Sequence, residues 1–229
     1  PPYNYFIINF ITFSLFFIFL FNKKKYLSNN KSFFKYGWCF GFGYFLFSLY
    51  WVVISLTFDH SFRFLIPFAI ILVPAFLALF YGLITYVFSI FYSKNVVSSF
   101  FIFSISFGII EFIRGFIFTG FPWNLIAFSF SDSIYFIQIL SVIGTYSFNL
   151  FCISLFTIPA LFVLRKSIKE TMICFLFILV SISFLIFGNI KNNNFYSLED
   201  IKNSYTIKAI SPNISLDRFY SKQDELKII

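Results

Sequence analysis

A carboxylate and a guanidinium stand three residues apart within a long apolar stretch, at Glu111 and Arg114. An ionised side chain at bilayer depth costs roughly 2.5–3.5 kcal/mol on insertion scales, so it usually has an internal partner or a function. Positions three apart on a helix share a face, and the two opposite charges can therefore offset one another. The spacing predicts a buried ion pair, with a packing role and a direct functional role both open.

The residues after this pair predict the end of a membrane helix. Gly115 and Gly120 bracket a short apolar run, and Pro122 lacks the N–H group needed to continue a helix. Trp123 is of a residue type that prefers the headgroup layer of a bilayer. The segment 111–124 is therefore expected to leave the membrane at Pro122 and Trp123.

The composition excludes a soluble globular domain. Hydrophobic residues make up 59% of the 229 residues, charged residues only 11%, and the mean hydropathy is +0.87. The net charge of +8 could suggest nucleic-acid binding, but the basic residues lie between hydrophobic runs, where they orient a membrane protein. Nucleic acid is therefore not expected as a partner.

Runs of about 18 or more apolar residues predict transmembrane helices. Six spans are expected, at about residues 3–21, 33–58, 64–92, 96–118, 134–164 and 170–187. The loops at 22–35, 93–95 and 165–169 hold nine Lys and Arg, whereas the alternate loops at 58–63 and 119–133 hold one. The positive-inside rule then places the basic loops in the cytoplasm, and Trp123 and everything after residue 187 outside, which is the periplasm in a bacterium.

Two local patterns predict how the helices pack. Gly37 and Gly41 form a small-xxx-small pair, which lets another helix approach closely. Pro67 and Pro74 lie inside one expected span and predict a kinked helix.

The cysteines and the single histidine do not form a reactive or metal-binding set. Cys39, Cys152 and Cys174 lie in apolar runs without metal-ligand spacing, and burial makes a thiol inert. They are expected to be small core residues, and His60 a solvated loop residue. The sequence therefore predicts no metal site and no cofactor.

The character of the chain changes after the last span. Residues 189–204 predict a polar linker, Tyr205 to Ser211 reads as a β-strand, and 215–229 suits the start of an amphipathic helix. One strand and part of a helix cannot bury a core, so the chain is expected to be a fragment of a longer protein. The predicted domains are a transmembrane helical domain at 1–188, the linker, and the start of a soluble domain at 205–229.

Four blocks, in order, resemble bacterial apolipoprotein N-acyltransferase. They are Pro1-Pro2-Tyr3, the glycine-rich run from Gly37 to Tyr44 with Tyr50-Trp51, the run from Glu111 to Trp123, and Ser211-Pro-Asn-Ile214. The resemblance implies an α-helical polytopic membrane bundle, with about six transmembrane helices here, followed by the first strand and helix of a periplasmic nitrilase-like α/β domain.

The resemblance also implies an activity. An acyl chain from a phospholipid donor would pass through a cysteine thioester to the N-terminal α-amino group of a diacylglyceryl-lipoprotein acceptor, at the bacterial inner membrane. A glutamate would act as the base and a lysine would stabilise the oxyanion. These three catalytic residues would lie beyond Ile229, so no catalytic residue is expected in this chain.

By the same resemblance, Gly120 and Trp123 match substrate-binding positions near the cavity where acyl chains enter. Phe219 follows Arg218 where the family usually has a Lys–Trp pair, after a spacer one residue shorter, and is a third substrate-binding candidate. Glu111, Arg114 and Pro122 are expected to support the loop. A structural ion pair of this kind should tolerate a charge swap better than a single alanine replacement.

Two other functions stay open on the sequence. A non-catalytic transporter or scaffold subunit could use Glu111, Arg114 and Gln138 to line a polar path, since intramembrane charges often do so. The same frame could also serve a different acyl transfer. The part of the protein beyond Ile229 would discriminate between these readings.

Overall fold

The fold is a bundle of helices, seen in a computed structural model that describes residues 6–27, 29–58, 60–117, 120, 122–197 and 208. Across this described part the chain is helical and contains no strand. Six helical segments are long and apolar enough to cross a membrane, which confirms the predicted number. They are α1 (Phe6–Tyr26), α2 (Asn30–Leu49) with the 3-10 helix η1 (Tyr50–Thr57), η2 (His60–Leu65) with α3 (Ile66–Phe91), α4 (Val96–Phe116), α7 (Thr145–Val163) and α8 (Ile168–Tyr196).

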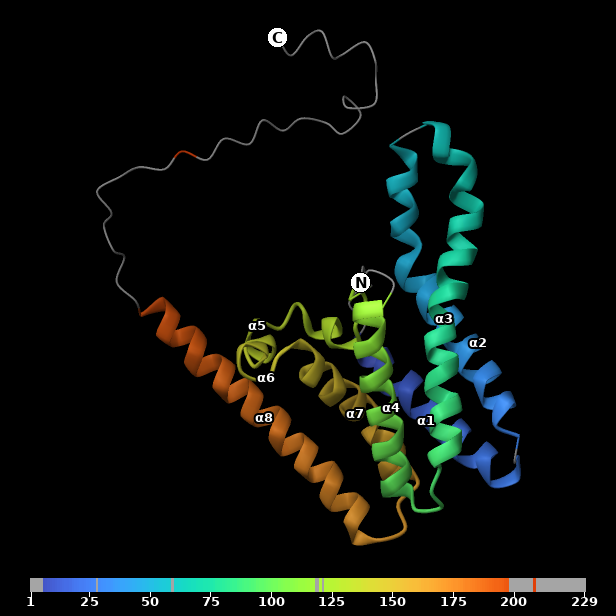
Figure 1. Ribbon diagram of the computed structural model, residues 1–229. Helices are drawn as coiled ribbons and strands as arrows, with labels where there is room; N and C mark the ends of the chain where they lie inside the picture. Colours follow the sequence, from blue (N-terminus) through green and yellow to red (C-terminus); the bar gives the residue numbers. More distant parts are fainter. Residues whose placement is uncertain are drawn as a thin grey trace.

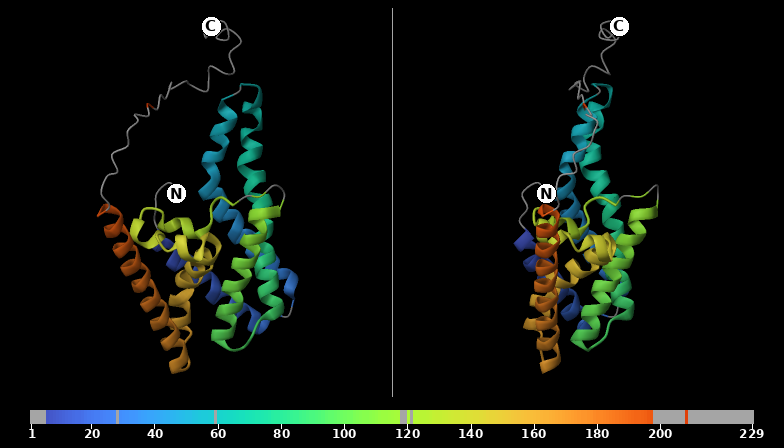
Figure 2. Two further views of the ribbon diagram at one scale, coloured as in Figure 1. Left: turned by 60° about the vertical axis from the view of Figure 1, so that its left-hand side comes forward. Right: turned by 90° about the vertical axis from the view of Figure 1, so that its left-hand side faces the viewer.

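The six segments differ in how closely they join the bundle. Figure 1 shows α2 and α3 side by side, and their joined ends η1 and η2 project beyond the ends of α4 and α7 in both Figure 1 and Figure 2. α8 leans away from the others, with two short helices, α5 (Ile134–Ile137) and α6 (Leu140–Ile143), beside its outer half.

The contact between α2 and α3 depends on the two glycines that the sequence singled out. A Cβ on Gly41 would lie 2.6 Å from the Cβ of Tyr81, and a Cβ on Gly37 would overlap Thr85. The Thr85 hydroxyl donates a hydrogen bond of 2.6 Å to the Phe33 carbonyl across the same interface. The predicted small-xxx-small contact is confirmed.

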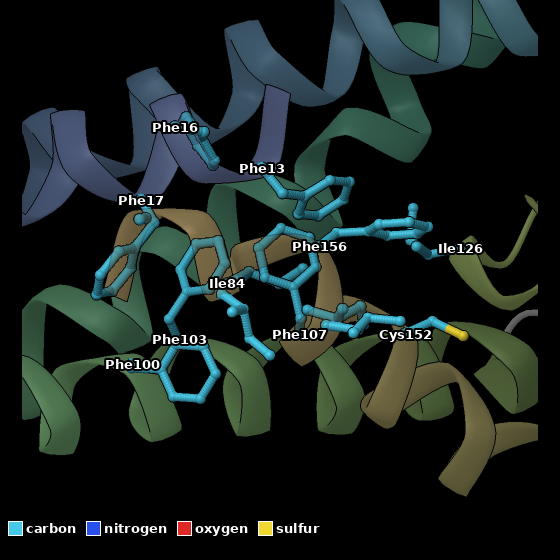
Figure 3. Packing of buried hydrophobic residues seen from close by; sticks show 14 of the residues in the cluster. Phe13, Phe16, Phe17, Ile84, Phe100, Phe103, Phe107, Ile126, Cys152 and Phe156 are labelled. Atoms are coloured by element: carbon cyan, nitrogen blue, oxygen red, sulfur yellow. The ribbon is translucent and has the colours of Figure 1, made fainter. Parts of the chain in front are cut away.

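Phenylalanines from α1, α4 and α7 fill the centre of the bundle. Phe17 of α1 meets Phe103 of α4 at a centroid distance of 5.3 Å, and Phe13 meets Phe107 at 5.5 Å, both edge to face. Figure 3 shows these rings together with Phe156 of α7. Edge-to-face pairs add about 0.5–1.5 kcal/mol each to the burial of their area, so this ring cluster fixes how the three helices meet.

The prediction of one long fifth span at 134–164 is wrong. The first part of this stretch forms the short helices α5 and α6, and only α7 crosses. Gly144 separates the two parts with a φ of +77°, a conformation that glycine adopts without strain. Hydropathy alone did not reveal this break, because a short apolar helix that does not cross the membrane can be as hydrophobic as a spanning one.

Several expected boundaries shift. α1 continues through Lys23, Lys24 and Lys25, whose long side chains can reach water while the backbone stays helical. α8 continues to Tyr196, through the first part of the stretch expected as a linker. Pro67 lies in the first turn of α3, so Pro74 alone is inside that helix.

The expected inert cysteines are found in two environments. Cys152 and Cys174 are buried, as predicted, whereas Cys39 is exposed on α2, so its assignment to the core is wrong. A small apolar side chain is accepted at a lipid-facing position as readily as in a core, since lipid tails are equally apolar.

The predicted strand at 205–211 and the predicted helix at 215–229 lie outside the described residues except for Lys208. The domain boundaries therefore stay predictions.

Candidate functional site

The Glu111 carboxylate is fully buried and is the centre of a polar cluster between α3, α4 and α7. Its Oε1 accepts a hydrogen bond of 3.1 Å from the Tyr81 hydroxyl, and its Oε2 accepts one from the Asn149 amide. Arg114 Nη2 lies 3.7 Å from Oε1, which confirms the predicted ion pair. Hydrogen bonds that reach the carboxylate from two other helices offset the cost of burying it.

Arg114 connects this cluster to the loop that follows α4. The guanidinium Nη1 donates a hydrogen bond of 3.1 Å to the Trp123 carbonyl, and the group lies over the ring of Phe45 at 5.5 Å. A cation over an aromatic face is attracted by the ring quadrupole. Arg114, which is 1% exposed, therefore ties the backbone of Trp123 to both α4 and α2.

Asn149 holds a second point of the same loop. Its Oδ1 accepts a hydrogen bond of 2.9 Å from the backbone N–H of Ala127, in the 3-10 helix η4 (Ile126–Phe130). The side chain is fully buried and uses both ends of its amide, one on Glu111 and one on η4. α7 therefore fixes η4 through one residue.

Residues of α2 hold the turn between these two points. Asn124 has a φ of +59°, a left-handed conformation that asparagine tolerates better than most residues. Its side-chain amide donates to the Ser48 hydroxyl at 2.6 Å, and its carbonyl accepts from the Tyr44 hydroxyl at 3.3 Å. The loop is thus hydrogen-bonded to α2, α4 and α7 within a few residues.

The held loop presents an aromatic cavity at its outer face. The rings of Trp51 and Trp123 stack with centroids 5.7 Å apart and an interplanar angle of 19°. Both rings are partly exposed, and with Pro122, Asn124 and Phe128 they line a cavity of about 470 Å³. Pockets of about 300–1,000 Å³ with mainly apolar walls are typical of small-ligand sites.

The structure brings most of the predicted site residues together. Glu111 and Arg114 support the loop from inside the bundle, and Pro122 and Trp123 line its cavity. Gly120 has a φ of +84°, and a Cβ there would lie 2.5 Å from the Gly115 carbonyl, so it serves the turn of the backbone. Phe219 lies outside the described residues.

Sequence reasoning missed Tyr81, Asn149 and the ring of Trp51 as members of the site. An uncharged amide in an apolar span is the signal that could have revealed Asn149, because polar side chains hydrogen-bond across membrane helices. Tyr81 gave no such signal, since Phe and Tyr are frequent throughout this chain. Trp51 was noted only as part of a block that resembles the family.

The described residues around the cluster were compared with the requirements of a metal site and of a cysteine nucleophile. Among the described residues, no group of three or more His, Cys, Asp or Glu side chains could hold a metal ion. The three cysteines all lie within membrane helices. These features define a class: a polytopic membrane protein in which a buried ionic cluster fixes an outer loop with an aromatic cavity.

Comparison with known proteins identifies the family. Residues 1–155 match the family model described as the apolipoprotein N-acyltransferase N-terminal domain, and the chain belongs to this family. With its six spans, it is part of a multi-pass protein of the bacterial inner membrane.

Three relatives illustrate the match, each named apolipoprotein N-acyltransferase. The protein of Rickettsia bellii is 32% identical over 193 residues, covering 83% of this chain and 37% of the relative. That of Rhizobium rhizogenes is 33% identical over 173 residues, covering 72% and 32%. That of Brucella melitensis biotype 1 is 38% identical over 128 residues, covering 56% and 24%. The chain therefore spans about a quarter to a third of the length of these relatives.

Proposed function

We propose that this chain is the membrane-embedded part of an apolipoprotein N-acyltransferase. The reaction moves an acyl chain from a phospholipid ester to a cysteine thiolate, releasing a lysophospholipid. The α-amino group of an N-terminal diacylglyceryl-cysteine then attacks the thioester, forming an amide and freeing the thiol. The family match over residues 1–155 is the observation that supports this activity.

The catalytic glutamate, lysine and cysteine of this proposal lie in a nitrilase-like domain beyond Ile229, on the periplasmic side. The greater length of the relatives leaves room for such a domain. The charge bias of the loops supports the orientation, since the loops that carry most of the Lys and Arg, before α2, α4 and α8, lie at the opposite end of the bundle from α5 and α6.

The part of the site that this chain contributes is the aromatic cavity. Trp51 and Trp123 are suited to a position between headgroups and hydrocarbon, where a lipid ester would pass on its way to the nucleophile. Gly120 and Pro122 shape the turn that presents Trp123, while Glu111 and Arg114 hold its backbone. The side chains of Glu111, Arg114 and Asn149 are at most 1% exposed, so no solute can reach them. This burial favours a role in supporting the loop over a role in lining a transport path.

The proposal is tested by removing the Trp123 ring in the natural gene product that contains this chain. Trp123→Ala should slow acyl transfer from a labelled phospholipid to a diacylglyceryl-peptide by about tenfold or more, because substrate positioning is lost. The amount of folded protein should stay unchanged, since that side chain is 55% exposed. Trp38→Ala is the control: this tryptophan donates to the Ala75 carbonyl at the α2–α3 contact.

Three results are informative. Slowing in Trp123→Ala but not in Trp38→Ala supports the cavity as part of the substrate path. Acyl-transfer rates equal to the wild-type rate in both variants would leave Trp123 as a membrane anchor only. Absence of acyl transfer in the wild-type gene product would refute the activity itself.

A further inference from the structure

A second and larger cavity lies on the other side of η4, between α7 and α8. It has a volume of about 820 Å³ and shares no lining residue with the aromatic cavity. Most of its walls are apolar, and they include Phe6 and Phe10 of α1, Leu155 and Pro159 of α7, and Ile178 and Leu185 of α8. We propose that this cavity binds an acyl chain of a resident membrane phospholipid, separate from any substrate lipid.

The cavity is closed at both ends along the helix axis. At the outer end, α8 touches α5 so closely that a Cβ on Gly188 would overlap the Tyr135 carbonyl. At the inner end, the Cys174 thiol contacts the Ile158 carbonyl of α7 at 3.9 Å. The stretch of α8 between these contacts rises about 21 Å at roughly 1.5 Å per residue.

That length decides which kind of occupant fits. A helix that crosses the bilayer is roughly 30 Å long, which exceeds the length between the two contacts, so it cannot lie between α7 and α8 parallel to them. An acyl chain can enter sideways, through the flank where Ile178 and Ile182 of α8 are half exposed at membrane depth. The geometry therefore favours lipid over polypeptide.

The distribution of polar groups matches an amphiphile. Of the polar lining residues, Ser129 belongs to η4, and Asp132 and Ser133 to the segment that joins η4 to α5. Figure 1 places this part of the chain at the outer end of the bundle. Deeper in the membrane the cavity is lined by apolar side chains and by Ser181, whose hydroxyl is bonded to the Phe177 carbonyl of its own helix. A lipid can place its polar end at the outer residues and its chain against the apolar walls.

An acyl chain in this cavity would support the candidate site through η4, which lies between the two cavities. η4 is a shared wall, because Phe128 lines the aromatic cavity while Ser129 and Phe130 line this one. The Asn9 amide of α1 donates to the Ser129 hydroxyl at 2.8 Å, which fixes the same wall from a further helix. A resident acyl chain would therefore fill space that otherwise leaves η4 free to move away from Asn149.

The proposal is tested by filling the cavity and measuring lipid contact. The natural gene product is placed in vesicles of phosphatidylethanolamine and phosphatidylglycerol with a trace of a phospholipid that carries a diazirine on its acyl chain. After irradiation, labelled peptides are mapped. Labelling of residues 155–159 and 178–185 is expected in the wild type and should fall severalfold in Ser181→Phe, whose ring would occupy the cavity.

Ser183→Phe is the matched control. Ser183 lies on the same helix, is exposed, and bonds only to its own backbone at Val180, but does not line the cavity. Its labelling should equal that of the wild type. Ile182→Trp, at the half-exposed mouth, gives a second filled variant if Ser181→Phe does not fold.

Two results would overturn the proposal. Equal labelling in the wild type and in a folded filled variant would mean that the label reports only bulk lipid. Absence of labelling at these residues in the wild type would mean that polypeptide fills the cavity. Neither result bears on acyl transfer, so the proposed function is tested independently.

Discussion

Two consecutive helices of this chain, α7 and α8, show an inverse relation between apolar character and burial. α8 is the more apolar of the two, yet only 11% of its most apolar window is buried, against 61% for α7. Lipid tails are as apolar as leucine, so hydrophobicity does not drive a helix into the interior of a membrane protein. Small and polar residues do, because they pack closely or form hydrogen bonds there.

Both helices include polar or small residues among those that they bury. α7 buries Asn149, Ser154 and Thr157 among its apolar residues. α8 buries three residues, and these are Glu170, Cys174 and Gly188, all polar or small. The helix that supports the candidate site is therefore the one with a polar side chain available for an inter-helix contact.

The largest effect is expected from removing the charge at the centre of the cluster that α7 contacts. Glu111→Ala should lower the free energy of unfolding by about 3–5 kcal/mol, because it leaves Arg114 buried without its counter-charge. Thermal unfolding of the purified protein in detergent measures this change. A near-wild-type melting temperature would show that the cluster does not stabilise the bundle.

The double exchange Glu111→Arg with Arg114→Glu refines this prediction. The sequence alone predicts that a swap is tolerated better than an alanine replacement, whereas the contact of Arg114 with the loop predicts the opposite. A carboxylate at 114 would face the Trp123 carbonyl, which now accepts from Arg114, and two acceptors cannot share a hydrogen bond. The swapped protein should be as unstable as Glu111→Ala, and its recovery to wild-type stability would contradict the asymmetric arrangement.

A somewhat smaller effect is expected at Asn149 of α7. Asn149→Leu keeps the volume but removes two hydrogen bonds, to Glu111 and Ala127, at a cost of about 1–3 kcal/mol for buried groups left unsatisfied. Unfolding in detergent gives the stability, and the fluorescence of Trp123 reports the loop. Ser154→Ala, which loses only a bond within α7, should change neither.

On α8, the largest effect is expected at its closest contact. Gly188→Ala should destabilise the protein by about 1–3 kcal/mol, because a Cβ would overlap the Tyr135 backbone and push α8 away from α5. Gly43→Ala is the control, since a Cβ there meets nothing within 4 Å. The control should be neutral or stabilising by about 0.5–1 kcal/mol, the usual benefit of alanine inside a helix. Equal melting temperatures for both variants would show that α8 is not held at Gly188.

The smallest effect is expected at the N-terminus of α8. Glu170 accepts from the Ser167 backbone at 2.9 Å, and the two residues form a capping box. Glu170→Ala should cost about 0.5–2 kcal/mol, the usual range for a lost cap. A loss as large as that of Glu111→Ala would mean that charge alone, and not its place in the bundle, decides the effect.

Much of the fold could be read from the sequence because hydropathy measures transfer into lipid directly. The six spans, the close contact at Gly37 and Gly41, and the ion pair were all predicted and are present. The break at Gly144 was missed, because a short helix that does not cross the membrane can have the same apolar composition as a spanning helix. Cys39 was wrongly assigned to the interior, because a lipid-facing position accepts a small apolar side chain as readily as a core position does.

The candidate site was predicted in part. Trp123 and Pro122 follow from local rules on interfacial tryptophan and on proline at helix ends, and both line the cavity. Trp51 of η1 meets Trp123 only through the folding of that segment against the loop, which no local pattern indicates.

By itself, the sequence determined that the chain is a membrane bundle, that Glu111 and Arg114 share a helix face, and that the chain resembles an acyltransferase family. These are properties of local spacing, of composition and of the order of short sequence motifs along the chain. The tertiary structure alone decided that Tyr81 and Asn149, 30 and 38 positions from Glu111, complete its hydrogen bonds. It also decided that α7 is mostly buried within the described bundle while the more apolar α8 is mostly exposed. The physical reason is that lipid and protein interior are equally apolar, so hydrogen bonds and close packing between distant residues determine which helices meet.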